Sequence, residues 1–313
     1  MPRYAIGKMT SRLALGAARL GAFWQGKSLL DSQRSVRASL ELGVNFIDTA
    51  DVYALGLSER LIGALPRAER ERMIVCTKVG QLKTPLASFM AHRIQNKLSL
   101  ASVVAAVPRR TPKDVSLVPR CFDAAYVEYA LAQSLRRLRL ERVDILLLHS
   151  PSLADLAGSR FEAAATRMLA AGDAANFGVS CDTAAVARKA AELPYVSFVE
   201  LPVDVLMNEH RMLVGELAAR GIGVLARSPF GGGELASYCE KKLGAFDADV
   251  QAYCLQAVAN MPGVFTTIVG MSTAQRVRHN VALLRRRIPA DQRERMKRVL
   301  EPGAGATPPT EEF

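Results

Sequence analysis

Eight short hydrophobic runs, rich in β-branched side chains, recur along the chain. Segments with the apolar spacing of amphipathic helices lie between many of them. An alternation of strands and helices predicts a parallel sheet, because each helix carries the chain back to start the next strand. The runs lie at 12–15, 44–47, 73–76, 143–148, 176–179, 197–201, 223–226 and 266–269, and helical spacing is found, for example, at 35–42, 124–140, 161–171, 183–193, 209–220 and 250–260.

The number and character of these runs favour a closed (β/α)8 barrel, the TIM barrel, over an open doubly wound sheet. Near-continuously apolar strands are typical of a parallel sheet that is covered by helices. An open dinucleotide-binding sheet commonly has a GxGxxG motif after its first strand, and none follows 12–15 here. The length of 313 residues suits one barrel, so we expect a single domain over 1–313.

One long interruption follows the third run. Residues 80–120 contain four prolines and many basic side chains. A connection of this length in a compact domain is usually functional or disordered, so we predict a lid loop on the face where barrel chemistry takes place. Its cations would suit an acidic substrate, and a solvated, mobile loop is the alternative. The final segment, 303–313, is predicted to be an irregular tail.

Charge and composition narrow the function classes. The net charge of +11 comes from cations spread along the chain, which indicates solvated helix faces or a phosphorylated cofactor rather than a nucleic-acid partner. Five cysteines have no metal-binding spacing and no signal peptide is evident, so we expect a reducing cytoplasm. The apolar segment 98–107 is too short to cross a bilayer, which needs about 20 residues, so no membrane association is expected.

Polar side chains stand where three successive apolar runs end. Asp48 closes the second run, Lys78 the third and His149 the fourth, and Tyr53 follows Asp48 by five residues. Taken singly, each has a structural explanation, such as a helix cap, a solvated cation, a core histidine or a rim tyrosine. Because the carboxyl ends of barrel strands meet on one face, we expect the four to lie together.

This set of groups suits the reduction of a carbonyl. Hydride delivery to the carbonyl carbon builds negative charge on oxygen, which requires a proton donor and electrostatic stabilisation. Tyr53 is the expected donor, and Lys78 is expected to favour its phenolate, because the ordinary tyrosine pKa of about 10 is high for neutral conditions. Asp48 would orient Lys78, and His149 would align the substrate oxygen.

The sequence resembles the aldo-keto reductases. The similarity rests on 43–63, which contains Asp48 and Tyr53, on the arginine-rich 134–138 that leads into 143–151, and on 177–180 and 228–231. The resemblance implies an NADPH-dependent reduction of an aldehyde or ketone to an alcohol, or the reverse, on a small-molecule substrate. It also implies that Asp48, Tyr53, Lys78 and His149 form the catalytic tetrad, without a metal.

The resemblance further implies a cofactor site at the ends of the first, fifth, sixth, seventh and eighth strands. Glycine-rich turns after strands seven and eight commonly bind phosphate in this barrel. Arg276 stands where the family often binds the 2′-phosphate, which favours NADPH over NADH. The expected cofactor-binding residues are Gly16, Ala17, Ser180, Cys181, Glu200, Arg227, Ser228, Phe230, Gly231, Gly270, Ser272, Arg276 and Asn280.

Three of these positions depart from the family pattern. Cys181 stands where an asparagine is usual, Glu200 where a glutamine is usual and Arg227 where an aromatic residue is frequent. An ionised glutamate only accepts hydrogen bonds and a thiol is a weak donor, so carboxamide recognition should be changed. Because strands six and seven are barrel neighbours, we hypothesise that Glu200 and Arg227 form an ion pair under the nicotinamide.

Two other functions remain as alternatives. The altered nicotinamide positions fit a cofactor-binding regulator or scaffold protein with weak or no turnover, against which the complete tetrad argues. A barrel lyase or isomerase that uses Lys78 as a base would instead bind no nicotinamide. Oxidation of NADPH in the presence of aldehydes or ketones distinguishes these possibilities.

Overall fold

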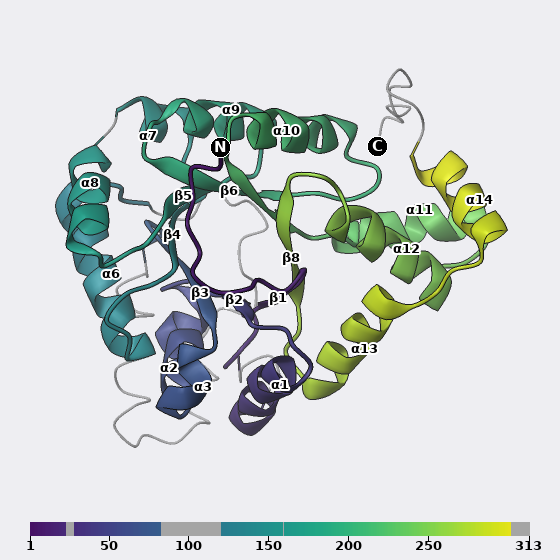
Figure 1. Cartoon of the computed structure of the whole chain (residues 1–313), viewed down its shortest axis with the longest axis horizontal. Helices are drawn as coiled ribbons and strands as arrows, with labels where there is room; N and C mark the ends of the chain where they lie inside the picture. The colour runs from purple at the N-terminus through teal and green to yellow at the C-terminus, as the bar shows by residue number, and fades with distance from the viewer. Residues whose placement is uncertain (23–27, 83–119, 159, 302–313) are drawn as a thin grey trace, which may run out of the picture.

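The fold is a closed barrel of eight parallel strands. The computed structural model describes residues 1–22, 28–82, 120–158 and 160–301. Neighbouring strands pair in parallel from β1 to β8, and β8 closes on β1 (Figure 1). The (β/α)8 barrel is thereby confirmed. The strands are β1 (Leu13–Gly16), β2 (Phe46–Asp48), β3 (Ile74–Val79), β4 (Ile145–His149), β5 (Phe177–Ser180), β6 (Val196–Pro202), β7 (Gly223–Arg227) and β8 (Val264–Gly270).

Helices surround the barrel on the outside, as the ribbon in Figure 1 shows. Several begin at a side chain that caps the free backbone N–H groups of the first turn; Thr273, for example, accepts from the N–H of Arg276. The helices are α1 (Leu29–Glu41), α2 (Leu57–Gly63), α3 (Arg67–Glu71), α6 (Ala124–Leu138), α7 (Leu153–Ala157), α8 (Glu162–Ala171), α9 (Ala184–Glu192), α10 (Asn208–Ala219), α11 (Glu234–Leu243), α12 (Ala248–Ala259), α13 (Ala274–Arg285) and α14 (Ala290–Leu300), with short 3-10 turns η2 (Tyr53–Gly56) and η4 (Gly231–Gly233).

The strands extend to the polar residues that were expected at their carboxyl ends. β2 includes Asp48, β4 includes His149, and β3 continues through Lys78 to Val79. The backbone ladder does not depend on side-chain polarity, so pairing continues beyond the last apolar residue. The polar residues are therefore held on rigid strands, not on the loops that follow.

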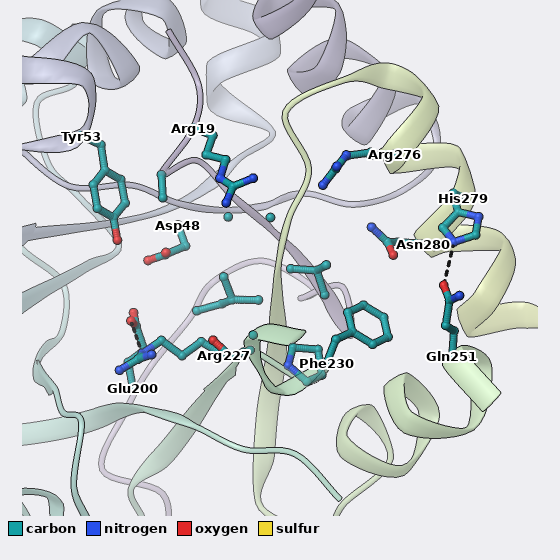
Figure 2. Close-up of a pocket in the computed structure, with 18 residues that line it drawn as sticks. Arg19, Asp48, Tyr53, Glu200, Arg227, Phe230, Gln251, Arg276, His279 and Asn280 are labelled. Atoms are coloured by element: carbon teal, nitrogen blue, oxygen red, sulfur yellow. Dashed lines mark hydrogen bonds and ion pairs between the residues drawn. The ribbon is translucent and has the colours of Figure 1, made fainter. Parts of the chain in front are cut away.

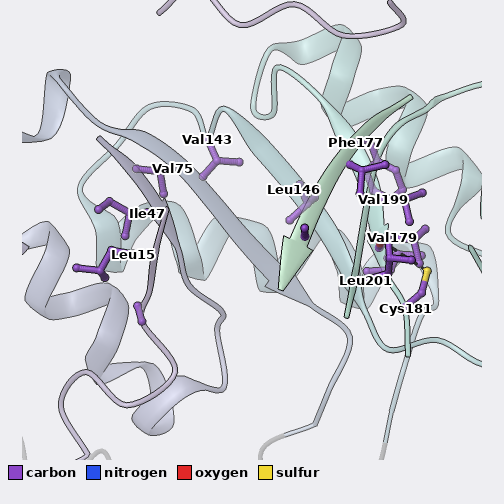
Figure 3. Packing of buried hydrophobic residues seen from close by; sticks show 14 of the residues in the cluster. Leu15, Ile47, Val75, Val143, Leu146, Phe177, Val179, Cys181, Val199 and Leu201 are labelled. Atoms are coloured by element: carbon purple, nitrogen blue, oxygen red, sulfur yellow. Dashed lines mark hydrogen bonds between the residues drawn. The ribbon is translucent and has the colours of Figure 1, made fainter. Parts of the chain in front are cut away.

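Side chains alternate between the barrel interior and the helix layer. Ala14, Phe46, Ile74 and Leu147 belong to a buried cluster inside the barrel, whereas their strand neighbours pack outward against the helices. Figure 3 shows part of the outer cluster, with residues such as Ile47, Val75 and Leu146. This two-residue period places Asp48, Lys78 and His149 on the inner face, two residues beyond Phe46, Cys76 and Leu147.

The predicted lid and tail lie almost entirely outside the described residues. Of 80–120, the part 83–119 is not described, and neither is the 303–313 segment. At the described ends of the loop, Gln81 and Arg120 pair in an antiparallel bridge. Among the described helices, none has the length and apolar character of a membrane span.

Candidate active site

A cavity of about 660 Å³ opens at the carboxyl ends of the strands. Figure 2 shows Tyr53, Asp48 and Glu200 at one side of it and Arg276, His279 and Asn280 at the other. Its lining is Gly16, Ala18, Arg19, Asp48, Tyr53, Glu200, Arg227, Ser228, Pro229, Phe230, Gly232, Gln251, Ile268, Val269, Gly270, Arg276, His279 and Asn280.

The four residues of the predicted tetrad come together at one side of this cavity. The ammonium of Lys78 is buried and forms an ion pair with Oδ1 of Asp48. Lys78 Nζ lies 3.4 Å from the hydroxyl oxygen of Tyr53 and also donates to the carbonyl oxygen of Thr49 at 3.3 Å. The rings of Tyr53 and His149 meet edge to face with centroids 5.7 Å apart. One ammonium thus bridges a buried carboxylate and a phenol on the cavity wall.

Unusual backbone conformations follow the functional side chains. Five non-glycine residues in the described part of the chain have positive φ, and four of them lie one or two residues after Tyr53, His149 or Arg227. These are Ala54, Leu55, Ser150 and Ser228, with φ between 48° and 59°. Such conformations cost free energy for residues with a Cβ and are concentrated at functional sites. The turns after these strand ends are therefore shaped at a cost in stability.

Burial and charge shift the pKa values of Tyr53 and Lys78. Burial opposes the charged form of Lys78, but the carboxylates of Asp48 and Glu200 outweigh it and raise the ammonium pKa well above its usual value. Burial is the largest influence on Tyr53 and raises its pKa; Lys78 lowers it, and Asp48 and Glu200 raise it. Lys78 acts in the expected direction, yet the phenol stays protonated at neutral pH because burial and the two carboxylates prevail.

His149 and Asp48 are also shifted. Burial, followed by the charges of Lys78 and Arg227, lowers the pKa of His149 well below its usual value, so its imidazole is neutral at physiological pH. Burial and the charge of Glu200 raise the pKa of Asp48 to about 7, against the opposing effect of Lys78. A neutral imidazole beside Tyr53 is able to donate a hydrogen bond to a carbonyl oxygen without competing for the tyrosine proton.

The hypothesised ion pair between Glu200 and Arg227 is present, but each residue has a further strong contact. Arg227 Nε lies 3.6 Å from Oε1 of Glu200, while the other end of the guanidinium forms an ion pair with Asp182 and donates to the carbonyl oxygen of Cys181 at 3.2 Å. Glu200 Oε2 lies 3.2 Å from Lys78 Nζ. Glu200 therefore belongs to the charge network of the tetrad as much as to that of Arg227.

Ser180 and Cys181 do not line the cavity. Ser180 faces the barrel interior, where its hydroxyl donates to Oε1 of Glu200 at 2.9 Å. Cys181, one residue later, faces the opposite side and is fully buried in the outer cluster (Figure 3). Both hydroxyl and thiol are thus committed within the protein. Because neighbouring residues of a strand face opposite sides, the sequence already predicts that Cys181 faces away from the cavity if Ser180 faces inward.

The far side of the cavity contains most of the other expected cofactor residues. Gly16, Ser228, Phe230, Gly270, Arg276 and Asn280 line it, whereas Ala17, Gly231 and Ser272 do not. Sequence reasoning missed Arg19, Gln251 and His279, which also line it; His279 Nε2 and Gln251 Oε1 lie 3.2 Å apart (Figure 2). Arg19 was detectable as a cation three residues beyond the end of β1.

The donor set fits an anionic dinucleotide at this far side. Arg19 and Arg276 are exposed cations on the cavity wall. The three glycines that form η4, Gly231 to Gly233, have positive φ, and so does Ser228, which precedes them. Successive turns of this kind direct backbone N–H groups toward anions, and guanidinium groups suit phosphate. At the near side, by contrast, Ser180, Cys181 and Glu200 are committed to protein partners.

Three side chains inside the barrel have atoms of a kind that could hold a metal ion. These atoms, from Asp48, Cys76 and Glu200, lie within 4.8 Å of one another, and all three residues are buried. The ammonium of Lys78 contacts both carboxylates, so a positive charge already occupies this cluster.

The fold and the site thus define a closed parallel barrel whose cavity has Tyr53, Lys78 and Asp48 at one side and exposed arginines at the other. The aldo/keto reductase family model matches residues 12–252, and the chain belongs to this family. A 6-dehydroglucose reductase of Novosphingobium aromaticivorans is 30% identical over 85% of this chain and 78% of its own length. A pyridoxal 4-dehydrogenase of Microbacterium luteolum is 24% identical over 90% and 92%.

Solved structures show the same fold. An aldo-keto reductase of Bacillus halodurans in its holo form superposes with a TM-score of 0.73 at 21% identity, covering 93% of this chain and 92% of that one. The glycerol dehydrogenase of Gluconobacter oxydans gives 0.71 at 18% identity, covering 98% and 97%. Family and relatives together support an oxidoreductase that interconverts carbonyl and alcohol groups with a nicotinamide cofactor.

Proposed function

We propose that the protein reduces an aldehyde or ketone with NADPH, or oxidises the corresponding alcohol, and that Tyr53 is the general acid. The observation that carries this proposal is the contact between Tyr53 Oη and Lys78 Nζ at 3.4 Å, with the Asp48 carboxylate behind the ammonium. When bound, the cofactor supplies a hydride to the carbonyl carbon. The proton for the oxygen comes from this chain.

Each side chain of the tetrad has a separate task. The protonated phenol of Tyr53 lines the cavity and donates its proton to the substrate oxygen. Lys78 lies behind it and stabilises the phenolate that forms, because an ammonium 3.4 Å away opposes the developing negative charge. Asp48 fixes the position of Lys78. The neutral imidazole of His149, whose ring meets that of Tyr53 edge to face, orients the substrate oxygen.

The preference for NADPH over NADH rests on the cations of the far side. Arg276 lies in the first turn of α13 and lines the cavity, with its side chain exposed. A guanidinium that is free to meet a ligand suits the dianionic 2′-phosphate, which NADH lacks. Arg19, another exposed cation of the cavity lining, would hold another phosphate of the cofactor. We assign Gly16, Ser228, Phe230, Gly270 and Asn280 to the walls of the same groove.

The test is cofactor oxidation with a substrate panel. Purified protein is mixed with NADPH and with aldehydes and ketones of increasing size, and with NADP⁺ and the matching alcohols, and the reduced cofactor is followed by absorbance. Turnover with members of the panel is the expected result. Binding of NADPH without turnover on any of them would favour a cofactor-binding regulator, and absence of nicotinamide binding would overturn the proposal.

A further inference from the structure

The ammonium of Lys78 lies between two buried carboxylates. It forms an ion pair with Asp48 and lies 3.2 Å from Oε2 of Glu200. The side chains of Lys78, Asp48 and Glu200 are 0%, 5% and 3% exposed, so water screens these charges little. Glu200 reaches this position because β6 places it on the inner face, two residues beyond Phe198.

The charges in this cluster do not balance when both carboxylates are ionised. Cys76, which also faces the cluster, has a pKa raised well above its usual value by burial, so its thiol is uncharged. Burial, as the largest cause, raises the pKa of Tyr53 and lowers that of His149, so both are neutral. From β7, Arg227 approaches Glu200 at 3.6 Å but is partly exposed and paired with Asp182. From β5, Ser180 contributes an uncharged hydroxyl.

Two buried negative charges therefore face one fully buried positive charge. Like charges at close range in a desolvated site retain a proton, as in carboxylate pairs that cannot both ionise. Potential ligand oxygens of Asp48 and Glu200 lie within 4.8 Å of each other. The geometry thus favours one proton held between them, next to the ammonium.

We propose that Asp48 and Glu200 share one proton beside the Lys78 ammonium, and that this proton reloads Tyr53 through Lys78 after each carbonyl reduction. The second half of this statement rests on the proposed function. In the proton transfer from the carboxyl pair to Tyr53, Glu200 acts through Lys78 and does not contact the substrate, so it is a positioning residue. A glutamine in its place would be unable to hold the proton.

The proton steps balance without a further reactant. The O–H bond of Tyr53 breaks as its proton moves to the substrate oxygen. The phenolate then takes a proton from Lys78 Nζ, 3.4 Å away, and the amine takes the shared proton from the carboxyl pair. One proton from solvent then reprotonates the carboxyl pair. It enters next to Glu200, where the partly exposed Arg227 connects the cluster to water. Alcohol oxidation runs the same steps in reverse.

The upward shift of the Asp48 pKa agrees with a proton held by the two carboxylates. Burial, followed by the charge of Glu200, raises it from 3.8 to about 7, although Lys78 acts to lower it. Asp48 is therefore protonated below about pH 7 and ionised above it. Replacement of Glu200 by glutamine removes the second of these causes, so the Asp48 pKa should fall and Asp48 should cease to titrate near neutrality.

The first test uses the protein without cofactor or substrate. Infrared difference spectra across a pH titration detect the carbonyl stretch of a protonated carboxyl group. Wild type should lose one such band near pH 7, and Glu200→Gln should lack it. Asp204→Asn serves as the assignment control, because burial also raises the pKa of Asp204, outside the cluster. Absence of a protonated carboxyl band at pH 6 in Asp204→Asn, where the cluster is unchanged, would overturn the shared proton, and this outcome does not require any cluster variant to fold.

The second test is the pH dependence of kcat for carbonyl reduction. Wild type should slow by about tenfold per pH unit above pH 7, since the empty pair no longer reloads Tyr53. Glu200→Gln should vary by less than about twofold between pH 6 and 8. A uniform loss of rate with an unchanged profile would assign Glu200 a purely structural role and refute the reloading step. If wild type reduces no carbonyl, the proposed function fails, while the infrared titration still decides whether the proton is shared.

Discussion

The two sides of the cavity differ in how their charges meet water. At the near side, Asp48, Lys78 and Glu200 are almost fully buried and Lys78 contacts both carboxylates, so the pKa values of Asp48 and Lys78 depend strongly on their charged neighbours. At the far side, Arg19 and Arg276 are exposed. Desolvated charges suit proton transfer, while exposed cations suit phosphate binding at low cost. The comparison predicts that chemistry and cofactor affinity respond to different substitutions.

The largest effect should come from the near side. Tyr53→Phe removes the proton donor but keeps the ring that contacts His149. The rate of NADPH oxidation in a single turnover should fall by about 10²–10⁴-fold, whereas the NADPH dissociation constant, from fluorescence titration, should change by less than about twofold. Tyr195→Phe, which removes a buried hydroxyl that is not part of the cavity lining, is the matched control. Retained turnover in Tyr53→Phe would refute the assigned role.

At the far side, the expected effect falls on affinity and not on chemistry. Arg276→Gln should weaken NADPH binding by about 10–100-fold and leave NADH binding within about twofold, because a charge-assisted contact to phosphate is lost. Arg278→Gln, an exposed arginine of the same helix outside the cavity lining, should change neither constant. Equal losses for both cofactors, or tighter NADH binding by wild type, would contradict the 2′-phosphate contact.

Arg227 lies between the two sides of the cavity. Two substitutions there should change the relative affinity for NADP⁺ and NADPH in opposite directions, by a smaller amount. Its guanidinium, held by Asp182 and Glu200, should repel an oxidised nicotinamide. In Arg227→Leu, the ratio of the NADP⁺ to the NADPH dissociation constant should fall by about threefold to tenfold, since a partly exposed charge contributes about 1 kcal/mol. Asp182→Asn keeps the cation and should raise this ratio instead. No change in either variant would place the ring away from Arg227.

The smallest expected effect concerns stability. The folded protein holds the Asp48 proton up to about pH 7, whereas an unfolded aspartic acid releases it near 3.8, so folding stability is lost as the pH rises between these values. Glu200→Gln lowers the folded pKa and should raise the melting temperature by on the order of a few degrees at pH 8, with a smaller gain at pH 5. Glu41→Gln, at an exposed site, should give no pH-dependent difference. A gain independent of pH would contradict the shared titration.

Much of this molecule could be predicted from local patterns. The eight apolar runs gave the strands within a few residues, and the polar residues that ended three of them, Asp48, Lys78 and His149, lie together as expected. The two-residue period of a strand also predicts that Cys181, next to the inward-facing Ser180, faces outward. The ion-pair and hydrogen-bond partners of each polar side chain could not be predicted from these patterns.

The sequence by itself determined the order of strands, the face on which each strand-end residue lies and the chemical groups available at the rim, because these depend on period and on neighbours along the chain. Only the tertiary structure decided that Glu200 reaches Lys78 as well as Arg227, and that the Tyr53 pKa rises despite the nearby ammonium. Glu200 and Lys78 are separated by more than a hundred residues and meet only when the barrel closes. The degree of burial, which sets the pKa values, is equally a property of the closed barrel.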